Sequence, residues 1–230
     1  MAQAATSELT IGLLMVGSYL LGSIPFGLWL VKRWKGIDIR TVGSGNIGST
    51  NVGRVTGPLG YIIVFIFDLL KGLLPPLLAA HLGLASQWQI LAALCGIIGH
   101  NYSLFLGFKG GKGIAASAGA LFGVSPLVGV GVACIFIIEI LTLRWVSFGS
   151  ILGAAALPFL TLWLYPGDYY RLGFAVLAGG MALYKHRSNL QRLRAGTEPK
   201  VHFPWNAKSV DIQLESVPEE KIQQDSNHKG

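Results

Sequence analysis

Charged residues are scarce in this sequence. Only 13% of its 230 residues are Asp, Glu, Lys or Arg, whereas a soluble domain carries about 25%. The apolar residues make up 52% of the total and come in long runs, which is typical of a polytopic membrane protein. The net charge of +7 does not indicate a nucleic-acid partner, because the basic residues are spread over short loops between the apolar runs.

Cysteine is also rare, and the usual signals of a secreted or metal-binding protein are missing. Cys95 and Cys134 both lie inside apolar runs, so we expect small core residues and neither a disulfide nor a metal site. We expect no metal and no cofactor, since no cluster of metal ligands is visible. We also expect no cleavable signal peptide of the usual form, because no Lys or Arg precedes the first apolar run.

Seven apolar segments predict an all-α, polytopic integral membrane protein with seven transmembrane helices. Some segments are shorter than the ~20 residues that a full span needs, which favours tilted or re-entrant pieces. The segments cover residues 9–31, 57–82, 88–99, 114–124, 127–143, 151–165 and 169–184.

The basic residues orient these segments. With the N-terminus outside and the C-terminus cytoplasmic, the inner loops and tail hold sixteen of the eighteen Lys and Arg residues, as the positive-inside rule requires. Residues 32–56 are predicted to form a polar loop. We expect residues 1–198 to form the membrane domain and residues 199–230 to form a partly disordered cytoplasmic tail. Glycine, serine and proline at positions 22–27 predict a kink or a close helix contact in the first segment.

The most distinctive polar feature is a glycine-rich stretch after the third apolar segment. It carries His100 and then the run Gly110-Gly111-Lys112-Gly113. Exposed backbone N–H groups, the Lys112 cation and the start of a following helix would together suit a phosphate. It is not a Walker A loop, because Leu106 and Gly113 stand where that motif has Gly and Ser or Thr. The alternative is a plain turn between membrane helices.

Residues 44–54 are rich in hydroxyl groups, amides and glycines and end in an Arg. Such a segment offers hydrogen bonds and a bidentate cation to a phosphate or a polyol. An ordinary solvated loop is the alternative. The candidate ligands are Ser44, Asn46, Thr50, Asn51 and Arg54.

Asp68 and Lys71 lie inside the second apolar segment. Their i, i+3 spacing places them on one helix face, and charges at this depth either pair with each other or line a cavity. Glu139 is a similar residue, and we expect it to join this network or to lie near the inner surface.

Two further clusters contain Ser147 and Ser150 beside Arg144, and His186 and Asn189 after the last segment. A serine there could simply cap a helix, and the basic residues at 185–187 could be a stop-transfer signal. All these polar clusters fall on one predicted side of the membrane. A transporter would be expected to show polar features on both sides and often an internal repeat, so the pattern favours chemistry between a soluble phosphate compound and a lipid.

These clusters form four motifs: Ser44-Gly-Asn46-x-Gly48-Ser-Thr50-Asn51-x-x-Arg54, Asp68-x-x-Lys71-Gly72, Gly99-His100-x(9)-Gly110-Gly111-Lys112-Gly113 and Arg144-x-x-Ser147-x-Gly149-Ser150. The four motifs resemble those of the bacterial acyl-phosphate:glycerol-3-phosphate acyltransferases. The resemblance covers residues 9–197. It implies seven membrane helices and an active site on the cytoplasmic face of the bacterial inner membrane.

The implied reaction moves a fatty acyl group from acyl phosphate to the 1-hydroxyl of glycerol 3-phosphate, giving lysophosphatidic acid and phosphate. This is the first acylation of phospholipid synthesis, and a soluble acyltransferase partner makes the acyl phosphate. Because an acyl phosphate is already activated, no enzyme nucleophile is required. None is evident: the sequence lacks a Gly-x-Ser-x-Gly elbow, and Phe105 stands where acyl-CoA-dependent acyltransferases have the Asp of His-x(4)-Asp.

We therefore expect direct transfer by positioning and electrostatic stabilisation, with His100, Lys112 and Arg54 as catalytic residues. The donor phosphate is assigned to Lys112 with Gly110, Gly111 and Gly113, and glycerol 3-phosphate is assigned to Arg54 with Ser44, Asn46 and Ser147. His100 and His186 either orient the acceptor hydroxyl or stabilise charge, and the donor phosphate is the other candidate to take the proton. Further expected substrate contacts are Thr50, Asn51, Ser150 and Asn189.

The rival interpretations are a transporter or channel for a small anion and a non-catalytic membrane scaffold. The transporter or channel draws on the same basic loops and on the intramembrane Asp68 and Lys71.

Overall fold

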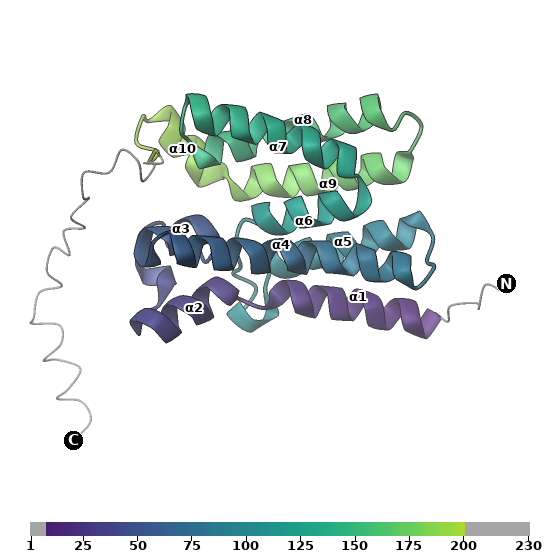
Figure 1. Cartoon of the computed structure of the whole chain (residues 1–230), viewed down its shortest axis with the longest axis horizontal. Helices are drawn as coiled ribbons and strands as arrows, with labels where there is room; N and C mark the ends of the chain where they lie inside the picture. The colour runs from purple at the N-terminus through teal and green to yellow at the C-terminus, as the bar shows by residue number, and fades with distance from the viewer. Residues whose placement is uncertain (1–7, 201–230) are drawn as a thin grey trace, which may run out of the picture. The chain divides into compact units, whose positions relative to one another are not determined.

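A computed structural model describes residues 8–200, and within that range the regular secondary structure is all helix, with no strand (Figure 1). The helices are α1 (Glu8–Ser23), α2 (Phe26–Lys35), α3 (Ser49–Thr56), α4 (Pro58–His81), α5 (Ser86–Asn101), α6 (Ile114–Val124), α7 (Pro126–Thr142), α8 (Val146–Leu164), α9 (Tyr169–Lys185) and α10 (Arg187–Arg194), with 3-10 turns η1 (Ile39–Thr41) and η2 (Leu104–Leu106). The predicted tail lies almost wholly in residues 201–230, outside the described range, and stays a prediction.

Several helices have the length and composition of membrane spans. Within residues 8–200, four helical segments are long and apolar enough to cross a membrane: Glu8–Lys35, Pro58–His81, Ser86–Leu106 and Val146–Leu164. Helices α6 and α7 are apolar but shorter. Large apolar side chains point outward from the bundle, including Phe159 and Trp163, which are 73% and 76% exposed. Such a surface suits a lipid environment rather than water.

Each of the seven predicted segments is helical, but how many of them span the membrane stays a prediction. The orientation of the termini is likewise a prediction. The predicted kink is confirmed as a break, since α1 ends at Ser23 and α2 begins at Phe26. A close helix contact is also present, because any side chain at Gly22 would overlap the backbone of Gly96 in α5.

Two local predictions were wrong, and one helix was missed. Residues 32–56 are not only a loop, because they contain η1 and α3. Val52 of α3 is fully buried in a small core with Ile39 and Val64, and this packing stabilises a helix too short to persist alone. The apolar segment predicted to begin at residue 151 begins five residues earlier, because residues 146–150 belong to α8, and α10 was not predicted.

The short helix α6 holds the centre of the bundle. It contacts α4 most extensively, and it also contacts α5, α7 and α9. Glycines allow this proximity: a side chain at Gly72 would overlap the backbone of Ala116, and one at Gly119 would overlap that of Leu69. The largest buried apolar cluster joins α5, α6 and α9 through residues such as Ile97 and Phe174. Figure 1 shows α2, α3 and α10 at one end of the described helices.

Candidate active site

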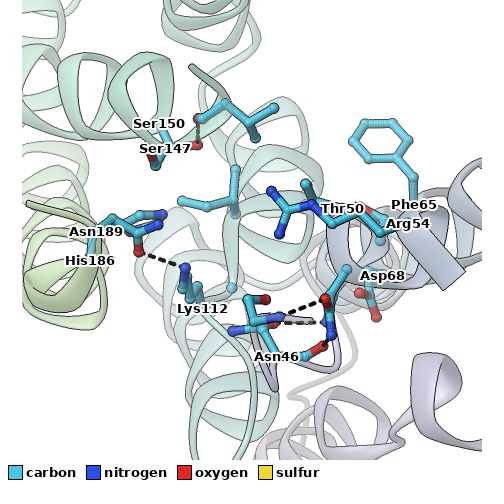
Figure 2. A pocket seen from close by; sticks show the side chains of 18 of the residues that line it. Asn46, Thr50, Arg54, Phe65, Asp68, Lys112, Ser147, Ser150, His186 and Asn189 are labelled. Carbon is cyan, nitrogen blue, oxygen red and sulfur yellow. Dashed lines mark hydrogen bonds between the residues drawn. The ribbon is translucent and has the colours of Figure 1, made fainter. Parts of the chain in front are cut away.

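A cavity of about 550 Å³ lies at that end, and it collects residues from all the predicted polar clusters. Figure 2 shows the side chains of Arg54 and Lys112 pointing toward the same space, with His186 and Asn189 on one side and Ser147 and Ser150 on another. Its polar lining includes Ser44, Asn46, Ser49, Thr50, Asn51, Arg54, Asp68, His100, Lys112, Ser147, Ser150, His186, Asn189, Arg192 and Glu198. Its apolar lining includes Tyr61, Phe65, Ile114, Phe136 and Val146.

The side chain of the predicted ligand Asn51 forms hydrogen bonds with the backbone of its own segment. Its side chain is 2% exposed, its Nδ2 donates to the carbonyls of Val42 (3.1 Å) and Asn46 (2.9 Å), and its Oδ1 accepts the N–H of Ser44 (2.9 Å). It therefore shapes the loop that presents Ser44 and Asn46. Arg54, one turn further along α3, is exposed to the cavity and has no carboxylate partner among the described residues.

Lys112 stands at the start of α6 and is held by a neutral partner. Its Nζ donates to Oδ1 of Asn189 at 2.6 Å, the dashed contact in Figure 2. Burial, with a smaller contribution from the cations Arg192 and Arg54 that Glu198 partly offsets, lowers the pKa of Lys112 to about 8. Lys112 is thus a cation at neutral pH that has not been neutralised by an ion pair.

The glycines around Lys112 serve tight packing as well as access. A side chain at Gly111 would overlap the ring of His100, and one at Gly110 would overlap the His100 carbonyl. The N–H of Gly111 donates to that carbonyl at 3.0 Å, so it is not free for an anion. Gly110 and Gly111 line a neighbouring cavity instead of the main one, whereas Gly113 lines the main cavity. The predicted set of three glycines around one phosphate is therefore divided between two cavities.

A buried charge network adjoins the cavity, and two of its members, Asp68 and His100, are part of the cavity lining. Lys71 Nζ is 2.8 Å from Oδ1 of Asp68 and donates to the carbonyl of Ile24 at 3.0 Å, at the break between α1 and α2. His100 is 3% exposed, and its Nδ1 lies 3.7 Å from Asp68 Oδ1 without a hydrogen bond. Asp68 and Lys71 thus form the expected pair, and the pair supplies a hydrogen bond to backbone that the helix break leaves open.

Glu139 is buried but does not join this network. Its Oε1 accepts the N–H of Trp145 at 3.2 Å, immediately before α8 begins. A carboxylate at a helix N-terminus accepts a hydrogen bond from an otherwise unpaired backbone N–H and interacts favourably with the positive end of the helix dipole. Glu139 therefore fixes the first turn of α8, which carries Ser147. Ser150 donates to the carbonyl of Val146 at 2.7 Å.

His186 lines the same cavity as His100 and is equally buried, with 3% of its surface exposed. Its Nδ1 lies 2.8 Å from the carbonyl of Ala182, so Nδ1 carries the proton and Nε2 is the acceptor. Burial lowers the pKa of His186 to about 4, although the hydrogen bond to Ala182 opposes this. The imidazole is therefore neutral at physiological pH, with a lone pair available to a hydroxyl group.

Arg192 and Glu198 also line the cavity, and sequence reasoning missed both. Arg192 Nε and Asn189 Nδ2 each donate to the Glu198 carboxylate at 2.7 Å, and Trp145 Nε1 donates to the Glu198 carbonyl at 3.2 Å. Burial raises the pKa of Glu198, but its hydrogen bonds outweigh this and the pKa is lowered. The i, i+3 spacing of Asn189 and Arg192 was a usable signal, since it places both on one helix face.

Within residues 8–200, no group of three or more His, Cys, Asp or Glu side chains is arranged to hold a metal ion. The expectation that no metal is needed stays a prediction.

The family model described as glycerol-3-phosphate acyltransferase matches residues 12–196. The chain is 46% identical to the glycerol-3-phosphate acyltransferase of Geotalea daltonii over 84% of this chain and 97% of that protein. It is 42% identical to glycerol-3-phosphate acyltransferase 1 of Deinococcus radiodurans over 84% of this chain and 96% of that protein.

Two solved structures are also similar. The crystal structure of PlsY (YgiH), an integral membrane glycerol 3-phosphate acyltransferase, in its glycerol 3-phosphate form gives a TM-score of 0.79 at 39% identity, covering 84% of this chain and 96% of that one. Its lysophosphatidic acid form gives a TM-score of 0.76 at 38% identity, with the same coverage. The extent and identity of these matches show that the chain belongs to the glycerol-3-phosphate acyltransferase family.

Proposed function

We propose that this protein transfers a fatty acyl group from acyl phosphate to the 1-hydroxyl of glycerol 3-phosphate, giving lysophosphatidic acid and inorganic phosphate. The observation that carries the proposal is the meeting of Arg54 and Lys112 in one cavity that also has an apolar stretch of wall. Two cations suit two phosphate-bearing substrates, and an apolar wall suits an acyl chain. Membership of the family supports the acceptor, since its named relatives are glycerol-3-phosphate acyltransferases.

The substrates can be assigned to opposite sides of the cavity. Arg54, with Ser44, Asn46, Thr50 and Ser147 nearby in the lining, binds the phosphate of glycerol 3-phosphate. Lys112, at the N-terminus of α6, binds the phosphate of the donor, where the helix dipole adds to its charge. The donor's acyl chain runs along the apolar wall of Tyr61, Phe65 and Phe136.

The chemistry then needs no covalent intermediate. The acceptor hydroxyl oxygen attacks the acyl carbonyl carbon, a new ester C–O bond forms, and the anhydride C–O bond breaks with its electron pair leaving on phosphate. Lys112 stabilises the charge that develops on the departing phosphate. The hydroxyl proton passes to the leaving phosphate or to a histidine of the cavity lining, and the neutral Nε2 of His186 is one such acceptor.

We place the reaction at the cytoplasmic face of the bacterial inner membrane. The cations Arg54, Lys112 and Arg192 line the cavity at one end of the helices, and basic residues concentrate on the cytoplasmic side of membrane proteins. A soluble acyltransferase that makes acyl phosphate would supply the donor from that side. His100 stabilises the base of the cavity together with Asp68 and Lys71, and we expect His186 rather than His100 to contact the substrate.

The pKa of Lys112 predicts how substrate binding changes with pH. A group with pKa about 8 is charged below pH 8 and neutral above it, so attraction for phosphate is lost as pH rises. We expect kcat/KM to fall about tenfold per pH unit above this value, because kcat/KM follows the free enzyme. Steady-state kinetics between pH 6.5 and 9.5 tests this. The Lys112→Arg variant, which stays charged throughout, should show a flatter profile even if its absolute rate is lower. An equally steep decline in Lys112→Arg would assign the pH dependence to another group.

The two cysteines test the absence of an acyl-enzyme. Cys134 is exposed on α7, and Cys95 lies within 3.9 Å of the sulfur of Met15, while neither lines the cavity. The Cys95→Ala/Cys134→Ala double variant is expected to keep kcat within about twofold of the unsubstituted protein, because direct transfer needs no thiol. A folded but inactive double variant would require a covalent route.

The decisive experiment gives the purified protein palmitoyl phosphate and radiolabelled glycerol 3-phosphate and measures lysophosphatidic acid. Acyl-CoA and acylated acyl carrier protein serve as alternative donors, and we expect product only with acyl phosphate. Uptake of labelled glycerol 3-phosphate into sealed vesicles carrying the protein, with no donor present, tests the rival transporter. Uptake without acyl transfer would overturn the proposal.

A further inference from the structure

A second cavity of about 390 Å³ adjoins the first, and we name it the basic vestibule. It shares Ser44, Asn46, Lys112 and Arg192 with the main cavity. Its other lining residues are Arg40, Gly45, Ile47, Lys109, Gly110, Gly111, Lys185, Arg187 and Ser188. Ile47 is the one large apolar residue in this lining, so the vestibule has no wall for an acyl chain.

The lining carries an excess of positive charge. Six of its residues are Lys or Arg, and none of the described residues that line it is Asp or Glu. Two of the six are paired with carboxylates outside the lining, Arg40 with Asp38 and Arg192 with Glu198. The other four make no ion pair with any described carboxylate: Lys109, Lys112, Lys185 and Arg187.

Some of these cations are held in place by neutral groups. Lys185 donates to the carbonyl of Asn101 at 2.6 Å and lies 4.4 Å from the ring centre of Tyr102, and Lys112 donates to Asn189. The protein thus fixes positive charges around a small space without supplying a counter-charge. Mutual repulsion in such a space is relieved when a small anion enters.

We propose that the basic vestibule is a further phosphate-binding site, separate from the sites of the two substrate phosphates in the main cavity. A phosphate dianion matches its charge and its polar lining, and a lipid does not because the vestibule lacks an apolar wall. Resting on the proposed function, the bound species is the inorganic phosphate released by acyl transfer. It passes from one side of Lys112 to the other, since Lys112 lines both cavities. The phosphate of an arriving glycerol 3-phosphate has the same chemistry and is the other possible source.

The test is direct phosphate binding by the purified full-length protein in zwitterionic nanodiscs and phosphate-free buffer. Equilibrium dialysis with labelled inorganic phosphate is expected to show at least two sites for the unsubstituted protein. The Lys109→Ala/Arg187→Ala variant removes two cations that line only the vestibule, and it should weaken one site by at least about tenfold. Lys32→Ala/Arg33→Ala, which removes equal charge from α2, should change neither site by more than about twofold.

A second arm repeats the titration with glycerol 3-phosphate. Inorganic phosphate that occupies the vestibule while glycerol 3-phosphate does not identifies the released product; equal binding of both identifies a site shared with the arriving substrate. Loss of a site through vestibule substitution supports the proposal even if the protein proves inactive with acyl phosphate, because binding needs no turnover. Unchanged phosphate binding in Lys109→Ala/Arg187→Ala overturns it. If that variant aggregates, the Lys109→Gln/Arg187→Gln variant provides the same comparison. Inorganic phosphate should also inhibit acyl transfer less strongly in the Gln variant than in the unsubstituted protein, and unchanged inhibition counts against the site.

Discussion

Replacing Lys112 with Ala is expected to lower kcat/KM by about 10³-fold, which is the upper range for removing one group that stabilises developing charge. The physical reason is that Lys112 lines both cavities and lacks a carboxylate partner, so its full charge is available to a departing phosphate. Its amide partner Asn189 holds the ammonium in position without cancelling that charge. The measurement is steady-state acyl transfer from acyl phosphate with both substrates varied.

The matched control is Lys35→Ala, which removes a cation from the end of α2. It lines neither cavity and should leave kcat/KM within about twofold, because an exposed distant charge is screened by salt. Equal thermal unfolding midpoints for both variants would show that folding is retained. A Lys112→Ala enzyme that turns over within threefold of the unsubstituted protein would remove Lys112 from the mechanism.

The long apolar runs made it possible to predict the positions of most membrane helices from the sequence. Runs of apolar residues and basic loops predicted the positions of α4, α6, α7 and α9 within a few residues, because the lipid environment demands continuous apolar length. The helix α3 escaped notice because its eight residues show no long apolar run. It owes its stability to burial of Val52 against residues from α2 and α4, and that contact is visible only once the chain is folded.

The sequence revealed the polar clusters, but it did not reveal which of their residues face the cavity and which serve the fold. Arg54, Lys112, His186 and Asn189 do meet in one cavity. Asn51 looked like a ligand from its composition, yet its amide is consumed by backbone groups. Gly110 and Gly111 looked like a phosphate-binding loop, yet they are also needed because any side chain at either position would overlap His100. A one-dimensional pattern records which groups are available and not which partners reach them first.

Asp68→Ala is expected to destabilise the folded protein by about 3–5 kcal/mol, the usual cost of leaving one partner of a buried ion pair alone. Lys71 is 2% exposed, and without Asp68 its ammonium would keep only neutral partners, the Ile24 carbonyl and the face of the Phe26 ring. We expect a large fall in the thermal unfolding midpoint and a poor yield of monodisperse protein. Thermal unfolding of detergent-solubilised protein, followed by circular dichroism, measures the effect.

The Asp68→Leu/Lys71→Met double variant separates a structural pair from a functional one. Removing both charges leaves no unpaired ion, so much of the lost stability should return, as for other buried pairs replaced by apolar residues. Because Asp68 also faces His100 at 3.7 Å, its acyl-transfer rate then carries separate information. A stable and active double variant would assign the pair to the fold alone. A stable but inactive one would extend the catalytic machinery to the floor beneath the cavity, through the Asp68–His100 contact. If the double variant is no more stable than Asp68→Ala, the unpaired Lys71 charge is not the cause of the destabilisation.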